Sequence, residues 1–527
     1  MKRISLLLVA VFLSACGPPP EPAGITFVHL NDTYRVGAVE DGNAGGFSRV
    51  VTLVRELQDE GRDVRILHGG DFLYPSLESQ LWNGLQIVDA FNFMDAVAPL
   101  YAVSGNHEFD RRGPEQLIAA VRASEFDWLG DNYTFKTGAT DVDNALQRAF
   151  TFEAAGRKVG VFALTLHPDD GGNERDYLEN NGDYVAVAED TIAALEAQGV
   201  DLIIGVTHLH MWQDVELAGL KAKYPKLAFI VGGHEHEPEY SAGSDDAAVV
   251  MKGASNARIV WAIDVDIDAS GQATVNERKV VLDRSIAFDP DYEILANKWR
   301  SRLLGKFPFL EARVGTAALA LDSREVTVRN EESNWGNFIA DQMRGAFRDG
   351  KADLAFINGG TLRIDDFVEG DILFEDIGRT FGFSSYLRKT TLMGAEFREV
   401  LEAGYRGDGP SKGYFPQVSG FRVCIDRSRN SGDRIVSLQV PAEDGWQEIL
   451  DDAEYSIVVP DYLYRGGDGY DIPKDRPATP PASELKYLVL DGILAAQAMG
   501  EQIGAPVDPA NPRFEQLSQD DDRCFQN

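Results

Sequence analysis

Residues 105–110 read Gly-Asn-His-Glu-Phe-Asp, and they directly follow an apolar run, Leu100–Ser104, that is typical of a buried strand. The glycine lets the chain turn sharply where the strand ends, and the residues after it carry an amide, an imidazole and two carboxylates. Open α/β sheets build their sites at the carboxyl ends of their strands. This stretch therefore predicts an α/β fold with a functional site at the edge of a sheet.

The same arrangement recurs along the first half of the chain, where short apolar runs predict buried strands and most of them end at polar residues. The predicted strands are Ile25–Leu30, Val64–His68, Leu100–Ser104, Lys158–Leu164, Leu202–Thr207 and Leu227–Val231. Amphipathic segments such as Phe47–Asp59 and Val187–Ala197 lie between them. This alternation predicts a layered α/β domain.

The N-terminus has the features of an export signal. Lys2 and Arg3 precede an apolar run, residues 4–13, that is too short to span a bilayer and resembles a signal peptide. The run ends in Leu-Ser-Ala-Cys-Gly at residues 13–17, which resembles a bacterial lipobox, so we expect Cys16 to carry a lipid anchor. An ordinary cleaved signal peptide with a chance cysteine is the alternative.

Charge and cysteine content bear on location and partners. In a host with two membranes, a glycine directly after Cys16 favours an outer-membrane lipoprotein that faces the periplasm or the cell surface. A net charge of −34 opposes binding of nucleic-acid polymers, and a phosphate substrate would need a local positive centre. An oxidising compartment permits a disulfide between Cys424 and Cys524, and two free thiols are the alternative. The oligomeric state is not predicted.

In chain order, the polar motifs resemble the calcineurin-type metallophosphoesterase signature, D…GD…GNHE…H…GHxH. Within that group the chain resembles the 5′-nucleotidase/UDP-sugar hydrolase family, which adds a second domain. The resemblance implies a four-layer α/β/β/α sandwich followed by an α+β C-terminal domain. The expected parts are a signal peptide (1–16), a Pro-rich tether (17–24), a metallophosphoesterase domain (25–285), a connector helix or hinge (286–312) and a substrate-binding domain (313–527).

The resemblance also implies a two-metal centre that hydrolyses phosphate esters. The implied ligands are Asp71 as the bridge, Asp32 and His236 on one metal, and Asn106, His208 and His234 on the other. A hydroxide held by the metals attacks phosphorus, His107 stabilises the transferring group or protonates the leaving oxygen, and Asp110 orients His107. The donor set suits divalent Mn, Zn, Co or Mg. The remaining histidines, which match no motif, are expected to be structural: His29, His68, His167 and His210.

One departure from the family pattern concerns the first metal. Where the family carries Asn-Asp-x-His, this chain has a tyrosine, Tyr34, so one ligand is missing. The second motif continues as Gly-Asp-Phe-Leu-Tyr to Tyr74, which resembles the GDxxY of purple acid phosphatases, whose tyrosine binds Fe(III). Three alternatives follow: an Fe(III)–M(II) centre with Tyr74 as a ligand, a phenolate from Tyr34, or neither.

The C-terminal half carries the motifs of the family's substrate domain. Residues 329–341 resemble R-x-x-E-S/T-N-x-G-N-L-x-x-D, residues 358–363 resemble N-G-G-x-x-R, and Gly-Gly-Asp occurs at 466–468. The implied nucleotide-binding residues are Phe381 and Tyr462 as a stacking pair, Asp468 as the ribose acceptor, and Asn358, Arg363 and Arg329 for base and phosphate. The loop Thr-Phe-Gly-Phe at 380–383 departs from the family's P-F-G-N.

Removal of the 5′-phosphate of nucleotides is the function that these residues favour. The altered loop at 380–385 and Glu331, which replaces an arginine of some relatives, favour a broader phosphomonoesterase or phosphodiesterase acting on 2′,3′-cyclic nucleotides or nucleotide sugars. Two further alternatives are a non-catalytic, nucleotide-binding surface lipoprotein and a thiosulfate-releasing relative of the family. The family also implies rotation of one domain against the other, about a hinge that we place at 286–312.

Overall fold

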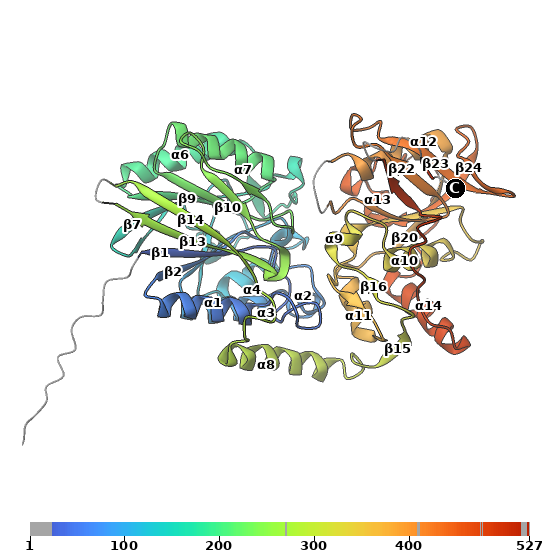
Figure 1. The fold of residues 1–527 in the computed structure, drawn as a ribbon, viewed down its shortest axis with the longest axis horizontal. Coiled ribbons are helices and arrows are strands. Elements are labelled where there is room, and N and C mark those ends of the chain that lie inside the picture. The colour runs from blue at the N-terminus through green and yellow to red at the C-terminus, as the bar shows by residue number, and fades with distance from the viewer. Residues whose placement is uncertain are drawn as a thin grey trace, which may run out of the picture.

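The computed structural model describes residues 24–268, 271–407, 412–474, 476, 478–517 and 524–525. The predicted signal peptide with Cys16, and the predicted tether up to residue 23, lie outside this part of the chain. Figure 1 shows two lobes side by side, the first drawn in blue to green and the second in yellow to red. Within the described residues, no helix is both long enough and apolar enough for a membrane crossing.

Two six-stranded sheets form the N-terminal domain. The strands of the first are β1 (Ile25–Leu30), β2 (Asp63–His68), β3 (Leu100–Val103), β4 (Asp127–Leu129), β13 (Ile259–Ile267) and β14 (Ala273–Val281). The strands of the second are β6 (Phe150–Ala154), β7 (Arg157–Thr165), β9 (Leu202–His208), β10 (Leu227–Gly232), β11 (Tyr240–Ser241) and β12 (Val249–Lys252). Their spatial orders are β14-β13-β1-β2-β3-β4 and β11-β12-β10-β9-β7-β6, with parallel and antiparallel neighbours in each. All six strands predicted from the sequence are present.

Helices cover the outer faces of the two sheets. In Figure 1, α1 (Phe47–Asp59), α3 (Leu85–Val97) and α4 (Glu115–Ala123) lie below the sheets, and α6 (Tyr184–Ala197) and α7 (Met211–Ala218) lie above them. The inner faces meet directly, since the rings of Phe27 on β1 and Phe229 on β10 are 5.3 Å apart. The predicted metallophosphoesterase sandwich is therefore confirmed.

Helix α1 illustrates why these segments are helical. It buries Val50, Val54 and Leu57, which are spaced three or four residues apart and so form one apolar stripe. Short segments of helix and strand complete the domain without adding a layer. They are α2 (Leu77–Trp82), α5 (Thr140–Asp143), β5 (Tyr133–Phe135) and β8 (Leu178–Asn180).

Helix α8 (Pro290–Lys306) lies within the predicted connector, residues 286–312, and in Figure 1 it runs below the first lobe toward the second. Asp289 caps its start by accepting hydrogen bonds from the backbone N–H groups of residues 291 and 292, and Pro290 fits the first turn because it has no N–H to satisfy. Trp299 packs on Trp82 of the N-terminal domain, with ring centroids 5.2 Å apart. The neighbouring Arg300 bonds to Glu375 of the C-terminal domain at 2.6 Å, so α8 contacts both lobes.

The C-terminal domain contains two four-stranded sheets and several helices. The sheets are β20 (Leu387–Met393), β25 (Glu454–Pro460), β17 (Leu354–Asn358) and β21 (Pro416–Ser419), and β24 (Gly445–Glu448), β23 (Ile435–Ala442), β22 (Arg422–Ile425) and β26 (Phe514–Gln516). Two-stranded pairs join β15 (Arg313–Thr316) to β19 (Asp371–Leu373) and β16 (Leu321–Asp322) to β18 (Phe367–Val368). The helices are α9 (Glu325–Val328), α10 (Asn334–Arg344), α11 (Phe374–Thr380), α12 (Gly394–Glu402), α13 (Asp461–Tyr464) and α14 (Leu485–Met499). This domain is mostly β.

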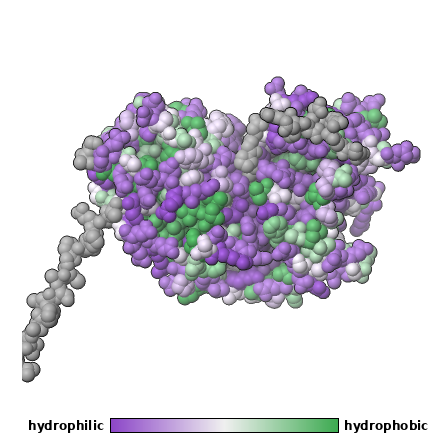
Figure 2. All heavy atoms as spheres, in the orientation of Figure 1, coloured by the Kyte–Doolittle hydropathy of each residue, from purple (hydrophilic) through white to green (hydrophobic). Residues whose placement is uncertain are grey.

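Cys424 of β22 is bonded to Cys524, so of the two alternatives for these cysteines the structure has the disulfide. Figure 2 shows a surface of mainly hydrophilic residues on this face, with hydrophobic residues in separate patches. That surface agrees with the charged composition of the chain, in which Asp and Glu outnumber Lys and Arg by 84 to 50.

Candidate active site

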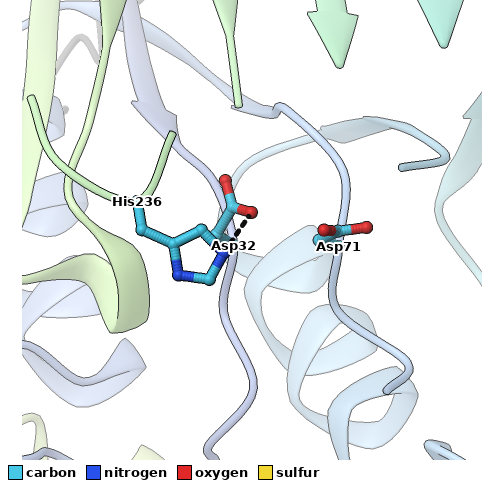
Figure 3. Close-up of side chains that lie close together, drawn as sticks. All are labelled: Asp32, Asp71 and His236. Atoms are coloured by element: carbon cyan, nitrogen blue, oxygen red, sulfur yellow. Dashed lines mark ion pairs between the residues drawn. The ribbon is translucent and has the colours of Figure 1, made fainter. Parts of the chain in front are cut away.

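Three predicted ligands of the first metal converge at the ends of their strands. Asp32 follows β1, Asp71 follows β2 and His236 follows β10, and each offers a ligand atom within 4.8 Å of the others. Figure 3 shows the three side chains turned toward one another. All three are buried, and unpaired buried carboxylates are costly, so the cluster fits a bound cation. Burial works to raise the pKa of Asp71, but His208 and His107 outweigh it and hold that pKa at about 2.

The predicted ligands of the second metal lie on the other side of Asp71. His208 places its Nε2 atom 3.2 Å from Asp71 Oδ2 and 3.2 Å from Asn106 Oδ1. Its Nδ1 atom lies 2.7 Å from the carbonyl oxygen of Gly69 and must donate to it, since a carbonyl only accepts. That leaves Nε2, which faces Asp71 and Asn106, as the His208 atom that would bind a metal. His234 lies beside His208, with ring centroids 5.4 Å apart, and its backbone N–H donates to Asp32 Oδ2.

The backbone at these positions is held in an unusual conformation. Asp32, Asp71, His234 and His236 have φ values of 52°, 61°, 88° and 65°, in the left-handed region that residues with a side chain seldom adopt. Such strain persists only where the surrounding structure enforces it, and it gathers at functional sites. Gly105 is required for a different reason, because a Cβ atom there would lie 2.2 Å from Asp71 Oδ1.

Glu108 organises the loops that carry the ligands. Its Oε1 atom accepts hydrogen bonds from the backbone N–H groups of Phe72 (2.7 Å) and Leu73 (2.9 Å). Its Oε2 atom accepts from the N–H groups of Asp71 (3.0 Å) and Gly105 (2.5 Å). A single buried carboxylate thus joins the loop after β2 to the loop after β3, which sets the position of Asp71.

The predicted dyad is present. His107 Nδ1 lies 2.8 Å from Asp110 Oδ2, and its backbone N–H donates to Asp71 Oδ1. Burial works to lower the pKa of His107, but Asp110 and Asp71 outweigh it and raise that pKa above its ordinary value. Asn173, which no motif singled out, donates its side-chain amide to Asp110 Oδ1 at 3.0 Å and to the backbone oxygen of Asn106 at 2.8 Å. It therefore holds Asp110 from a position 63 residues further along the chain.

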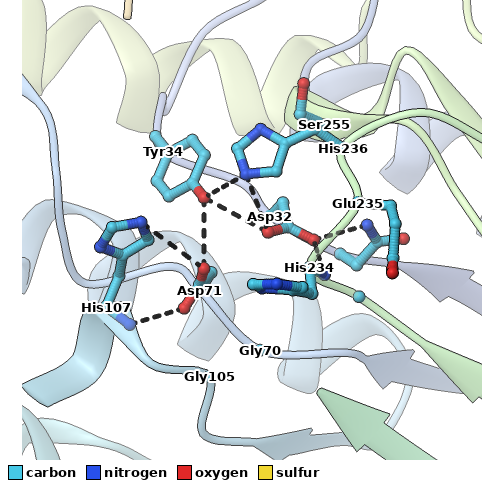
Figure 4. A network of polar contacts seen from close by, with 12 residues as sticks. Asp32, Tyr34, Gly70, Asp71, Gly105, His107, His234, Glu235, His236 and Ser255 are labelled. Atoms are coloured by element: carbon cyan, nitrogen blue, oxygen red, sulfur yellow. Dashed lines mark hydrogen bonds and ion pairs between the residues drawn. The ribbon is translucent and has the colours of Figure 1, made fainter. Parts of the chain in front are cut away.

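The two tyrosines proposed as iron ligands lie in different surroundings. The hydroxyl of Tyr34 is 3.0 Å from His236 Nε2, 3.3 Å from Asp32 Oδ1 and 3.4 Å from Asp71 Oδ2, as Figure 4 shows. The ring of Tyr74 instead packs on Phe383 and beneath the Arg111 guanidinium. Among the described residues, the Tyr74 hydroxyl makes no hydrogen bond to a predicted ligand. The structure thus brings Tyr34, and not Tyr74, to the metal ligands.

Residues of the C-terminal domain reach into this site. Arg363, predicted to bind phosphate, donates from Nη2 to His107 Nε2 at 2.9 Å, and its guanidinium lies between the rings of Tyr34 and Phe383. Among the described residues, its Nε atom has no hydrogen-bond partner, and the ion-pair neighbour of its Nη1 atom is Glu325 Oε1, 3.5 Å away, although the side chain is buried. Arg329 lies nearby and is paired with Glu325. Arginine N–H groups beside His107 are suitable donors for the oxygens of a phosphate.

The predicted nucleoside pocket forms in part. Tyr462, which is 46% exposed, donates its hydroxyl to Asp468 Oδ1 at 2.8 Å. Asn358 donates to the other oxygen of Asp468, also at 2.8 Å. Phe381 does not join them, because it is only 1% exposed and packs in the hydrophobic core of its domain. Phe383, two residues further, lies near the predicted catalytic imidazole, with its ring centroid 5.9 Å from that of His107.

Histidines outside the motifs have structural contacts. His29 bonds to the backbone oxygens of Leu67 and Gly232, and His68 bonds to Thr33. A buried lysine that no motif indicated, Lys252, forms ion pairs with Glu235 and Asp214 beside the loop after β10. These groups support the site and do not enter it.

Two family models match the chain. The model of the calcineurin-like phosphoesterases matches residues 25–238, which hold the predicted metal ligands. The model of the 5′-nucleotidase C-terminal domain matches residues 313–475, which hold the arginines and the nucleoside pocket. Together with the sandwich fold and the buried Asp–Asp–His cluster, these matches define a metal-dependent phosphoesterase.

Several known proteins are similar to most of this chain. The 5′-nucleotidase of Bos taurus is 26% identical over 529 residues, which cover 91% of this chain and 89% of that protein. The trifunctional nucleotide phosphoesterase YfkN of Bacillus subtilis is 25% identical over 497 residues, and the match spans 86% of this chain but only 33% of YfkN. The solved structure of a 5′-nucleotidase precursor from Thermus thermophilus has the same fold, with a TM-score of 0.80, 23% identity and coverage of 94% of this chain and 100% of that one. The chain belongs to the 5′-nucleotidase family, with a metallophosphoesterase domain followed by a 5′-nucleotidase C-terminal domain.

Proposed function

We propose that this phosphoesterase removes the 5′-phosphate of nucleotides. The observation that carries the proposal is the position of the second domain, which brings a phosphate-binding arginine, Arg363, to 2.9 Å from the catalytic imidazole of His107. The same domain carries Asp468 with both carboxylate oxygens bonded to Tyr462 and Asn358. One substrate with a phosphate and a ribose-linked base would use both groups. The names of the similar proteins support the same substrate class.

The residues of the chain divide the work of hydrolysis. When bound, the metal ions supply a nucleophile from water and neutralise charge on the phosphoryl oxygens. Arg363 and Arg329 orient the phosphate and add positive charge as the bond to the leaving oxygen breaks. Asp110 fixes the Nδ1 proton of His107, so Nε2 faces the site. Once Arg363 has moved from Nε2 to the phosphate, Nε2 takes up a proton, as the raised pKa of His107 favours, and passes it to the leaving oxygen.

We further propose that the site holds two metal ions and that Tyr34 is a ligand of the first. Its oxygen lies within 3.4 Å of atoms of Asp32, Asp71 and His236, where the family pattern has a histidine. Phenolate oxygen is a hard donor that suits Fe(III), so an Fe(III)–M(II) pair is compatible with this residue, and divalent Mn, Zn, Co or Mg with the rest of the set.

The location of the enzyme is also a proposal. The lipobox-like sequence at Cys16 supports export and attachment by a lipid anchor to the cell envelope, with the enzyme at the outer membrane facing the periplasm or the cell surface. The Cys424–Cys524 disulfide supports an oxidising compartment independently, because such bonds are rare in the cytosol.

The burial of Phe381 favours a second candidate function. With that ring in the core, Tyr462 is the predicted stacking residue that remains exposed, so the base would be held on one side only. A one-sided pocket would discriminate less between nucleotides and other esters. A broader phosphomonoesterase or phosphodiesterase, acting also on 2′,3′-cyclic nucleotides or nucleotide sugars, therefore remains the alternative.

A hydrolysis panel on metal-loaded protein distinguishes a 5′-nucleotidase from a broader phosphoesterase. Nucleoside 5′-monophosphates are compared with p-nitrophenyl phosphate in the wild type, in Tyr462→Ala and in the control Tyr487→Ala, which removes a tyrosine of similar exposure from α14. Stacking on one base contributes about 1–3 kcal/mol, so Tyr462→Ala should lower kcat/KM for nucleotides by roughly 5- to 150-fold. The simple ester should be hydrolysed as before. Equal losses on both substrates would favour the broader enzyme and contradict the nucleotide pocket.

A further inference from the structure

The carboxylate of Glu325 connects the two domains at the metal site. Glu325 begins α9 of the C-terminal domain, yet its Oε2 atom lies 2.6 Å from Nδ1 of His236, a predicted metal ligand of the N-terminal domain. The same oxygen accepts a hydrogen bond from the Ser255 hydroxyl at 3.1 Å. The Glu325 residue is 2% exposed. The contact is therefore enclosed by protein and strong.

This contact determines which ring nitrogen of His236 is available to the metal. A carboxylate accepts hydrogen bonds, so Nδ1 of His236 carries the hydrogen, and Nε2, which lies 3.2 Å from Asp32 Oδ1, is left to bind the metal that the two residues would share. His208 is oriented in the same way, but by the Gly69 carbonyl of its own domain. One ligand imidazole is thus held by neighbouring backbone and the other by a side chain from the second domain.

The second oxygen of Glu325 faces the phosphate-binding arginines. Oε1 pairs with Nη2 of Arg329 and lies 3.5 Å from Nη1 of Arg363. One buried carboxylate therefore touches both a metal ligand and the two cations expected to hold the substrate's phosphate. Binding of phosphate to the arginines and binding of metal by His236 both depend on the position of this carboxylate.

The contact exists only while the domains are docked. The backbone N–H of Glu325 donates to Asp365 Oδ1, which keeps the start of α9 in place. Asp365 in turn pairs with Arg258 of the N-terminal domain at 3.3 Å and bonds to Ser255 at 3.3 Å. These bonds cross the interface beside His236. Separation of the domains would remove the carboxylate from His236 and leave its ring without the partner that fixes it.

We propose that Glu325 is a positioning residue that orients His236 for metal binding when the substrate-binding domain docks. Docking of the domains thus increases the affinity for the metal ion that His236 binds. The proposal rests on the proposed two-metal phosphoesterase function. It assigns to the C-terminal domain a role in the metal centre in addition to binding substrate. Loss of such an outer partner of a metal-bound histidine lowers metal affinity by about 10- to 100-fold.

The test measures metal affinity and not only activity. Full-length protein is stripped with a chelator and titrated with Mn²⁺ as wild type, Glu325→Ala and Glu325→Gln. The isosteric glutamine keeps an oxygen that can accept from Nδ1 and guards against a folding defect in the alanine variant. The matched control is Glu78→Gln, which breaks a different ion pair between the domains, to Arg379 at 2.9 Å, away from the metal ligands.

We expect Glu325→Ala to weaken one of two Mn²⁺ sites by roughly 10- to 100-fold and to leave the other unchanged, with a smaller effect in Glu325→Gln. Activity of Glu325→Ala on p-nitrophenyl phosphate should recover as free Mn²⁺ is raised, and Glu78→Gln should bind Mn²⁺ as the wild type does. Unchanged affinity in both Glu325 variants would overturn the proposal, and so would an equal loss in Glu78→Gln. Failure of the wild type to bind any metal would instead overturn the proposed function, and this inference with it.

Discussion

Replacement of Glu108 by glutamine tests whether one buried carboxylate organises the ligand loops. The wild-type side chain accepts hydrogen bonds from four backbone N–H groups, two on each oxygen, at residues 71, 72, 73 and 105. Glutamine keeps a single oxygen and replaces the other with an NH₂ group, which donates and cannot accept. Two buried N–H groups therefore lose their acceptor whichever way the amide is turned.

The expected cost follows from that count. A buried donor left without a partner costs about 1–3 kcal/mol, so Glu108→Gln should lower the free energy of unfolding by about 2–6 kcal/mol. The assay is urea unfolding followed by circular dichroism, with the exposed Glu115→Gln as a control that should change by less than about 0.5 kcal/mol. The same variant should bind metal more weakly, because in either orientation of the amide the loop that carries Asp71 loses at least one of the hydrogen bonds that hold it. A Glu108→Gln protein as stable as the control would refute this account of the loops.

Three further perturbations probe other parts of the structure. Loading with Fe(III) should give the wild type a visible charge-transfer band that Tyr34→Phe lacks and Tyr74→Phe retains, measured by absorption spectroscopy; a band lost only in Tyr74→Phe would reverse the assignment of the two tyrosines. Glu375 pairs with Arg300 and Arg379, and although burial works to raise its pKa, Arg379 and Arg300 hold that pKa at about 2 instead of 4.5. Its carboxylate therefore stabilises the fold above pH 4.5, and that contribution is lost as the pH falls toward 2. Glu375→Gln should lower the free energy of unfolding by about 1–3 kcal/mol at neutral pH, as measured by urea unfolding, and by less in acid. A decrease that does not vary with pH would contradict the ion pairs. Replacing Cys424 and Cys524 by serine opens a loop of sequence separation 100 and should lower the free energy of unfolding by about 2–5 kcal/mol in calorimetry or urea titration, whereas an unchanged value would mean that the bond adds nothing to stability.

The strands, and the edge of the sheet where the polar residues gather, were predictable because both leave local signals. An apolar run between turn residues predicts a buried strand, and β1 occupies Ile25–Leu30 as expected from its sequence. Polar residues directly after such runs fall at one edge of a sheet, which predicted a site there, and the resemblance to metallophosphoesterases then implied that Asp32, Asp71 and His236 share a metal. For the strands and the polar residues that follow them, the local sequence is enough to predict their place in the fold.

Contacts between distant segments left no comparable signal. Glu325 lies 89 residues from His236, and Asn173 lies 63 residues from Asp110, so only the docked fold reveals either pair. The loop after α11 was misjudged for a related reason. Two phenylalanines lie two residues apart there, and the core of the domain takes the first, Phe381, while the second, Phe383, faces His107. Which of two similar residues is buried depends on the packing of the whole domain.

The central claim is that Asp32, Asp71, Asn106, His208, His234 and His236 hold a pair of cations, and the metal content of the purified protein tests it most directly. Protein loaded with Mn²⁺, Zn²⁺ or iron and then freed of unbound metal by gel filtration is analysed by mass spectrometry of the elements, beside Asp71→Asn. We predict two metal ions per chain in the wild type and a marked loss in the variant, because Asp71 lies between both groups of ligands. A wild-type protein that retains no metal after any loading would contradict the assignment.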